Sequence, residues 1–86
     1  MKNSDDFLLY VFPTTFYKEI NIRVLGTKEP IPFNFLNISG DLIFSGKVVE
    51  IEKIETELLP IGIYFVHYKQ HGESQYIKLI KKIRNN

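Results

Sequence analysis

Two histidines, His67 and His71, have the spacing that most readily suggests chemistry. On a helix, two residues four apart share a face, and a pair of imidazoles placed there can bind zinc. The neighbouring residues favour a strand followed by a turn, and four strand positions separate two side chains by about 13 Å. Zinc–nitrogen distances are about 2 Å, so this separation is too large for one ion. We interpret both as ordinary strand and turn residues and expect no metal site.

The acidic and hydroxyl residues give no catalytic arrangement. Asp5 and Asp6 form a carboxylate pair, but no acid, base or nucleophile stands beside them in the sequence. Ser39-Gly40-Asp41 lacks the strand–turn–helix context of a nucleophile elbow. The chain contains no cysteine, which excludes a cysteine nucleophile, an iron–sulfur site and a disulfide framework. We therefore expect a protein that is not an enzyme and has no cofactor.

The basic residues gather near the C-terminus, where Lys78, Lys81, Lys82 and Arg84 follow with no acid after Glu73. One interpretation is contact with anionic lipid, polysaccharide or an acidic protein face. The other is that lysines on a terminal edge strand discourage aggregation between sheets. The net charge of the whole chain is only +1, which is no signature of nucleic-acid binding.

The composition predicts the kind of element that must hold these residues. The chain has 86 residues and no alanine, and 33 residues are isoleucine, valine, threonine, phenylalanine or tyrosine. Such side chains suit the pleated, half-buried surface of a sheet, whereas alanine is the best helix former. The length is that of one domain. We expect residues 1–6 to be a linker or lead-in and residues 7–86 to form a single β-domain.

No segment has the length of a membrane helix or of a signal-peptide core. The longest uninterrupted apolar run is Phe7–Phe12, six residues. A membrane helix needs roughly 20 apolar residues and a signal-peptide core about 7–15. Asp5-Asp6 also stands where a signal peptide carries positive charge. We expect no transmembrane segment.

Alternation of apolar and polar residues predicts about seven short antiparallel strands. In Tyr17–Leu25, for example, Ile20, Ile22 and Val24 fall on one face and polar residues on the other. Short, regular spacing favours an antiparallel β-sandwich or barrel. The clearest strands lie within residues 7–12, 17–25, 31–38, 42–45, 63–68 and 75–82, with a bulge or turn at Gly46-Lys47 and a hairpin around Gly72.

Residues 48–59 allow two interpretations. Ile51, Ile54 and Leu58 have the spacing of one helix face. No capping residue precedes them, and Val48–Ile51 also suits a strand. Periodicity alone does not decide between helix and strand, and we predict a strand followed by a loop.

Four short motifs follow one another along residues 10–82. Val11–Ile22 holds a proline after an apolar strand and then an isoleucine–asparagine–isoleucine strand, and Asn37–Ile43 holds an asparagine-x-x-glycine turn. Leu59–Val66 contains leucine–proline–x–glycine–x–tyrosine, and Gly72–Lys82 contains a hairpin glycine and a lysine-rich last strand. In this order the motifs resemble the C-terminal sorting domain of proteins exported by the type IX secretion system of Bacteroidetes, the Por secretion tail.

The resemblance implies an immunoglobulin-like β-sandwich that serves as a sorting signal for a covalently linked N-terminal cargo domain. It implies recognition by outer-membrane translocon and sortase components, after transit through the periplasm, with delivery to the outer membrane, the cell surface or the medium. It also implies that these residues are a fragment of a longer precursor with its own signal peptide. Exposed strand edges make either a monomer or a weak dimer our expectation.

The recognition candidates are the residues on the motif positions of this family: Pro13, Gly62, Tyr64, Gly72 and Lys78. Gly62 is expected to allow a close backbone approach or an unusual φ, and Tyr64 to anchor its strand. Thr15 stands where the family has a second proline, and four residues follow Lys82. The sorting domain is our first hypothesis, and these departures are the features that fit the alternative, an immunoglobulin-like accessory or adhesion module without an export role.

Overall fold

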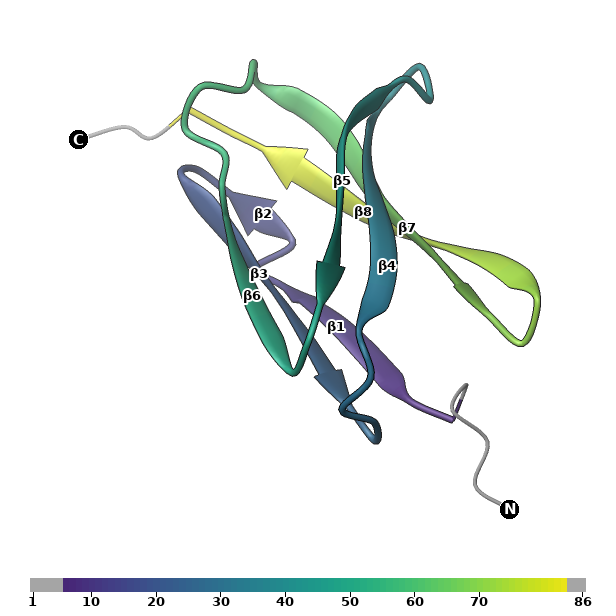
Figure 1. Cartoon of the computed structure of the whole chain (residues 1–86). Coiled ribbons are helices and arrows are strands. Elements are labelled where there is room, and N and C mark those ends of the chain that lie inside the picture. Colours follow the sequence, from purple (N-terminus) through teal and green to yellow (C-terminus); the bar gives the residue numbers. More distant parts are fainter. Residues whose placement is uncertain (1–5, 84–86) are drawn as a thin grey trace.

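The computed structural model describes residues 6–83, which form eight strands in two facing sheets (Figure 1). Residues 1–5, with Asp5 and most of the expected lead-in, and residues 84–86, with Arg84, lie outside the described part. The smaller sheet has the order β1 (Leu8–Phe12), β3 (Glu19–Leu25), β6 (Ile51–Glu55). The larger sheet has the order β2 (Thr15–Phe16), β8 (Glu73–Lys81), β7 (Gly62–Gln70), β4 (Ile31–Asn37), β5 (Leu42–Val48).

The strand order is that of an immunoglobulin-like sandwich. The smaller sheet corresponds to strands A, B and E, and β8, β7, β4 and β5 correspond to G, F, C and C′. This confirms the predicted β-sandwich. The prediction missed the two-residue β2, which pairs with β8 in parallel and makes the larger sheet mixed. Two residues are too few to show a period, so sequence alternation gives no signal for such a strand.

The core lies between the inward faces of the two sheets. The predicted inward face of β3 is confirmed, because Ile20, Ile22 and Val24 are at most 2 % exposed. From the larger sheet, Phe35 and Leu79 are fully buried against them. Burial of each such side chain stabilises the fold by about 1.5–3 kcal/mol.

The structure corrects the predicted bulge or turn at Gly46-Lys47. Strand β5 runs straight through these residues, and the chain turns at Val49-Glu50, where Glu50 has a φ of 65°. Gly46 lies opposite Phe33, and a Cβ at Gly46 would come within 3.2 Å of the Phe33 ring. The glycine thus makes room for an aromatic side chain on the neighbouring strand, a role that the local sequence does not reveal.

Residues 48–59 contain a strand followed by a loop, as predicted, but the strand is β6 and begins only at Ile51, after the turn at Val49-Glu50. Ile51 and Leu58 are 52 % and 97 % exposed, whereas Ile54 is 8 % exposed, so the three residues do not share a buried helix face. The predicted hairpin is also confirmed, with Gln70 paired to Glu73 across a two-residue turn. His71 and Gly72 form this turn with φ values of 54° and 76°, as a type I′ hairpin turn requires.

Candidate functional site

Three of the five recognition candidates, Pro13, Gly62 and Tyr64, come together near one end of the sandwich. We call this the corner end and define it as residues 12–18, 56–64 and 80–83 (Figure 1). The Ile80 amide donates a hydrogen bond to the Thr14 carbonyl at 2.8 Å, and Gly62 pairs with Lys81. Residues that are far apart in the sequence thus meet through the pairing of β2 and β7 with the end of β8.

Tyr64 fixes the connection between β6 and β7. Its hydroxyl donates a hydrogen bond to the Pro60 carbonyl at 2.6 Å, and its ring packs against those of Phe16 and Phe35. The side chain is 5 % exposed, and this burial raises the pKa of the Tyr64 hydroxyl. A tyrosine near the start of strand F that bonds back to the preceding loop is the tyrosine corner of immunoglobulin-like sandwiches. The leucine–proline–x–glycine–x–tyrosine motif therefore encodes a structural corner.

Gly62 begins β7 with a φ of 149°. A Cβ built at this position meets no heavy atom within 4 Å. Of the two expectations for Gly62, the structure supports the unusual φ and gives no sign of a close backbone approach. Residues with a side chain rarely adopt this conformation. Gly62 also lines an open hollow together with Ile61, Lys82 and Ile83.

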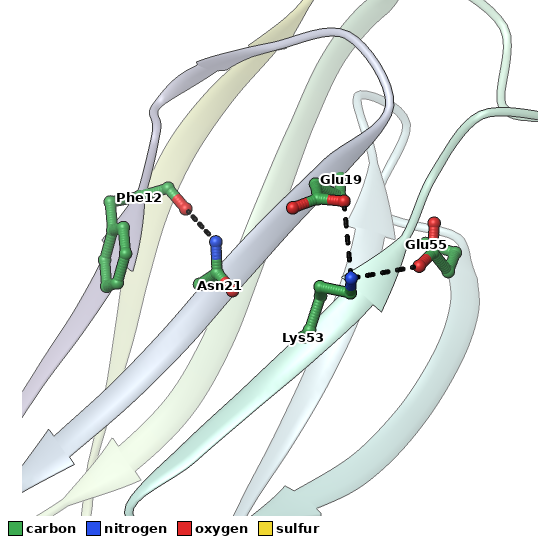
Figure 2. Close-up of polar contacts among 5 residues, drawn as sticks. All are labelled: Phe12, Glu19, Asn21, Lys53 and Glu55. Atoms are coloured by element: carbon green, nitrogen blue, oxygen red, sulfur yellow. Dashed lines mark hydrogen bonds and ion pairs between the residues drawn. The ribbon is translucent and has the colours of Figure 1, made fainter.

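Pro13 lies where the chain passes from the smaller sheet to the larger one, and the Phe12–Pro13 peptide bond is cis. Next to it, the Asn21 side-chain amide donates a long, 3.5 Å hydrogen bond to the Phe12 carbonyl (Figure 2). Figure 2 also shows the Lys53 ammonium between the carboxylates of Glu19 and Glu55, 3.7 Å from each. All three side chains are well exposed, so these ion pairs contribute at most about 1 kcal/mol each.

The predicted basic cluster is divided by the structure. Lys78 is exposed on the outer face of the larger sheet, opposite Phe65. Lys81 is only 6 % exposed, and its ammonium donates hydrogen bonds to the carbonyls of Thr56 and Glu57, the latter at 3.1 Å. Lys81 also lies 6.0 Å from the centre of the Phe16 ring, within reach of a cation–π interaction.

Sequence reasoning missed this role of Lys81 because lysine is seldom buried. A signal was present, since Lys81 and the buried Leu79 are two apart on one strand and so share its inward face. The ammonium ties the end of β8 to the loop that leads into the tyrosine corner.

The fifth candidate, Gly72, lies at the opposite end of the β7–β8 hairpin. Close to it, Asn34, His67 and Ser74 form a chain of hydrogen bonds across three strands. The distances are 3.0 Å from Asn34 Nδ2 to His67 Nδ1 and 2.9 Å from His67 Nε2 to Ser74 Oγ. In this order the three residues resemble a catalytic triad, in which Asn34 would orient His67, His67 would act as the base and Ser74 as the nucleophile. However, Ser74 is exposed on the outer face of a sheet, whereas acyl transfer needs a site that holds a substrate and excludes water.

Within residues 6–83, no three histidine, aspartate or glutamate side chains are close enough to hold a metal ion. The same residues contain no helix that could span a membrane.

Comparison with known families gives a match that covers nearly the whole chain. The family model of the secretion system C-terminal sorting domain matches residues 10–82, which include all five recognition candidates. Comparison with curated proteins finds no match. The family comprises sorting signals and is not an enzyme family. The chain therefore belongs to the secretion system C-terminal sorting domains and is a sorting signal for type IX secretion, which exports an attached cargo to the cell surface or out of the cell.

Proposed function

We propose that the type IX machinery recognises this domain in its folded form at the corner end. The observation that carries the proposal is that Pro13, on one side of β8, and Gly62 and Tyr64, on the other side, lie near the same end of that strand. Pro13 belongs to a different motif from Gly62 and Tyr64 and is remote from them in the sequence, and only the folded sandwich places all three near one end of β8. Partners in this proposal are the outer-membrane translocon and the sortase components, met after transit through the periplasm.

The first described residues enter the sandwich at the end opposite the corner end. Residues 6–7 enter at the opposite end, where the Gln70 side-chain amide donates a hydrogen bond to the Phe7 carbonyl at 2.7 Å. At that end, Gly26 also approaches the Asp6 carbonyl so closely that a Cβ would lie 2.9 Å from it. A cargo domain on the N-terminal side of the signal therefore adjoins the end that is remote from the tyrosine corner. A receptor could then bind the corner end whatever the cargo.

The corner end is also preorganised. The Tyr64–Pro60 hydrogen bond and the contacts of Lys81 with residues 56 and 57 hold the β6–β7 connection in one conformation. A surface that is already ordered loses little conformational entropy when a partner binds. The domain acts in this proposal as a ligand of the machinery and carries out no catalysis.

The test is export of a fluorescent reporter that carries a signal peptide and is fused in front of residues 1–86, in a type IX-competent bacterium. One variant replaces two exposed residues that line the hollow at the corner end, Ile61→Ser with Ile83→Ser. The matched control replaces two exposed leucines that pair with each other at the opposite end, Leu8→Ser with Leu25→Ser.

Both double variants remove two exposed apolar side chains, so the circular dichroism spectrum and melting temperature should stay close to those of the original domain. We expect the corner-end variant to lose most surface delivery and the control to keep it. Equal delivery of both variants would overturn the assignment of recognition to the corner end.

A further inference from the structure

Strand β8 has an open edge over most of its length. At its end, the amides of Ile80 and Lys82 donate hydrogen bonds to the carbonyls of Thr14 and Phe16, at 2.8 and 3.0 Å. Strand β2 covers only residues 80 and 81 of β8. Backbone groups alternate in direction along a strand. The N–H and C=O groups of Ser74, Tyr76 and Lys78 therefore point to the same edge, where no strand of residues 6–83 pairs with them.

This edge is more regular than the other open edges of the sandwich. Residues 73–79 contain no proline or glycine, and their pairing with β7 has no register shift. Strand β6 has the charged Glu52 at an inward-facing position. Strand β1 is only five residues long and is followed by Pro13. Strand β5 contains Gly46, and its pairing with β4 is interrupted by a bulge. Such features discourage the addition of a further strand. Among the strands formed by residues 6–83, only β8 offers a seven-residue edge without these features.

The side chains beside this edge indicate the chemistry of a partner. Lys78 is exposed, and Tyr76 is 60 % exposed. The other charged side chains that the strands of the larger sheet direct outward are also lysines, Lys47 on β5 and Lys69 on β7. Phe65, opposite Lys78, adds an apolar surface that is partly exposed. A neighbouring strand with carboxylates on this face would complement the lysines.

We propose that the open edge of β8 accepts an extended, acidic segment of a partner protein as an additional strand. This inference rests on the proposed function and adds a second contact with the machinery, along the part of β8 that adjoins the corner end. Backbone hydrogen bonds to residues 74, 76 and 78 supply affinity that depends little on sequence, and alternate side chains supply specificity. A second copy of this chain fits less well. Pairing two β8 edges would join two outer faces whose charged side chains are all lysines, and like charges repel.

The probe is a capped nine-residue peptide that alternates glutamate and valine, and its control is a peptide of equal length that alternates lysine and valine. Amide hydrogen exchange of the isotopically labelled domain is followed by NMR. We expect the acidic peptide to slow exchange of the Ser74, Tyr76 and Lys78 amides at least tenfold, and the basic peptide to leave it unchanged. Equal effects of both peptides, or no protection by the acidic one, would overturn the inference.

Two variants locate the binding. Tyr76→Pro removes an N–H that points away from β7, so the β7–β8 ladder loses no hydrogen bond and the acidic peptide should no longer protect residues 74 and 78. Lys78→Glu leaves the backbone N–H groups in place and should weaken binding of the acidic peptide at least tenfold. This variant tests the inference if the proline variant does not fold. Its matched control is Lys47→Glu, which lies on the same face at the far edge and should bind as the original domain does. Equal weakening by both lysine variants would contradict binding at the β8 edge.

The alternative outcome is protection of the same amides in the absence of peptide. If this protection increases with protein concentration, and sedimentation shows a dimer, a second copy occupies the edge and the choice of partner is overturned.

The export assay separates this inference from the proposed function. If Tyr76→Pro folds and is delivered as efficiently as the original domain, the strand-addition inference fails and the sorting role stands. If the original domain itself is not delivered, the proposed function fails.

Discussion

The hydroxyl of Tyr64 donates a hydrogen bond to the carbonyl of Pro60 at 2.6 Å, across the bend that joins the two sheets. This contact joins the start of β7 to the loop before it, and Gly62 provides the backbone conformation that lets the chain make the bend. The most recognisable motif of the sorting domain is therefore a device for holding the β6–β7 connection. The predictions below test the contributions of the residues around it.

Tyr64→Phe removes the hydroxyl and leaves the ring in the core. Because the Pro60 carbonyl then lacks its partner, we expect the free energy of unfolding to fall by about 1–2 kcal/mol, measured by urea denaturation. Tyr76→Phe is the matched control, since Tyr76 is 60 % exposed and its hydroxyl is free to bond with water. Loss of stability of the same size in both variants would contradict a specific role of the corner.

Alkaline pH should destabilise the domain. Burial raises the pKa of Tyr64 and Tyr68 above the ordinary value of 10.0. Below pH 10 both the folded and the unfolded chain hold these protons, so stability does not depend on them. Above pH 10 the unfolded chain loses the protons first, and the free energy of unfolding falls as the pH rises. Thermal unfolding of the Tyr64→Phe, Tyr68→Phe double variant should show a smaller decline than the original domain, and an unchanged decline would contradict this assignment.

Lys81→Met retains most of the buried side chain and removes its ammonium. The carbonyls of Thr56 and Glu57 lose a charged donor, so we expect the free energy of unfolding to fall by about 2 kcal/mol. Lys82→Met is the matched control on the next, exposed position and should change stability by less than about 0.5 kcal/mol. The free energies of unfolding of the two variants are compared by chemical denaturation. Equal losses would contradict a stabilising role of the hydrogen bonds from Lys81 to residues 56 and 57.

Gly62→Val tests the backbone conformation at the start of β7. A β-branched residue resists a φ of 149°, although the space around the Cβ is open. We expect the variant to be less stable by about 1–3 kcal/mol and to be exported less well. Ile61→Val, at the neighbouring exposed position, controls for the change in side chain. Unchanged stability and export in the Gly62 variant would remove the argument for this glycine.

The sequence predicted those parts of the fold that follow from local alternation. The inward face of β3 was predicted because Ile20, Ile22 and Val24 repeat with a period of two. The His71-Gly72 turn was predicted because glycine adopts positive φ readily. These features depend on residues that are close together in the chain.

The features that the sequence did not predict depend on partners from other strands. Gly46 is explained only by the Phe33 ring, and the burial of Lys81 only by carbonyls 24 and 25 residues away. The placement of Pro13 near the same end of β8 as Gly62 depends on β2, which is too short to show a pattern. The family motifs identified the candidate residues, and the structure was needed to show which of them lie together.

The central claim is that this domain is sufficient to direct a cargo through type IX secretion. The most direct measurement is surface fluorescence of a bacterium that produces a signal-peptide-bearing fluorescent protein fused in front of residues 1–86. We expect the reporter at the cell surface or in the medium of a type IX-competent strain, and in the periplasm of the same strain without its outer-membrane translocon. Retention of the reporter in the periplasm of the competent strain, while an established sorting domain delivers it there, would contradict the claim.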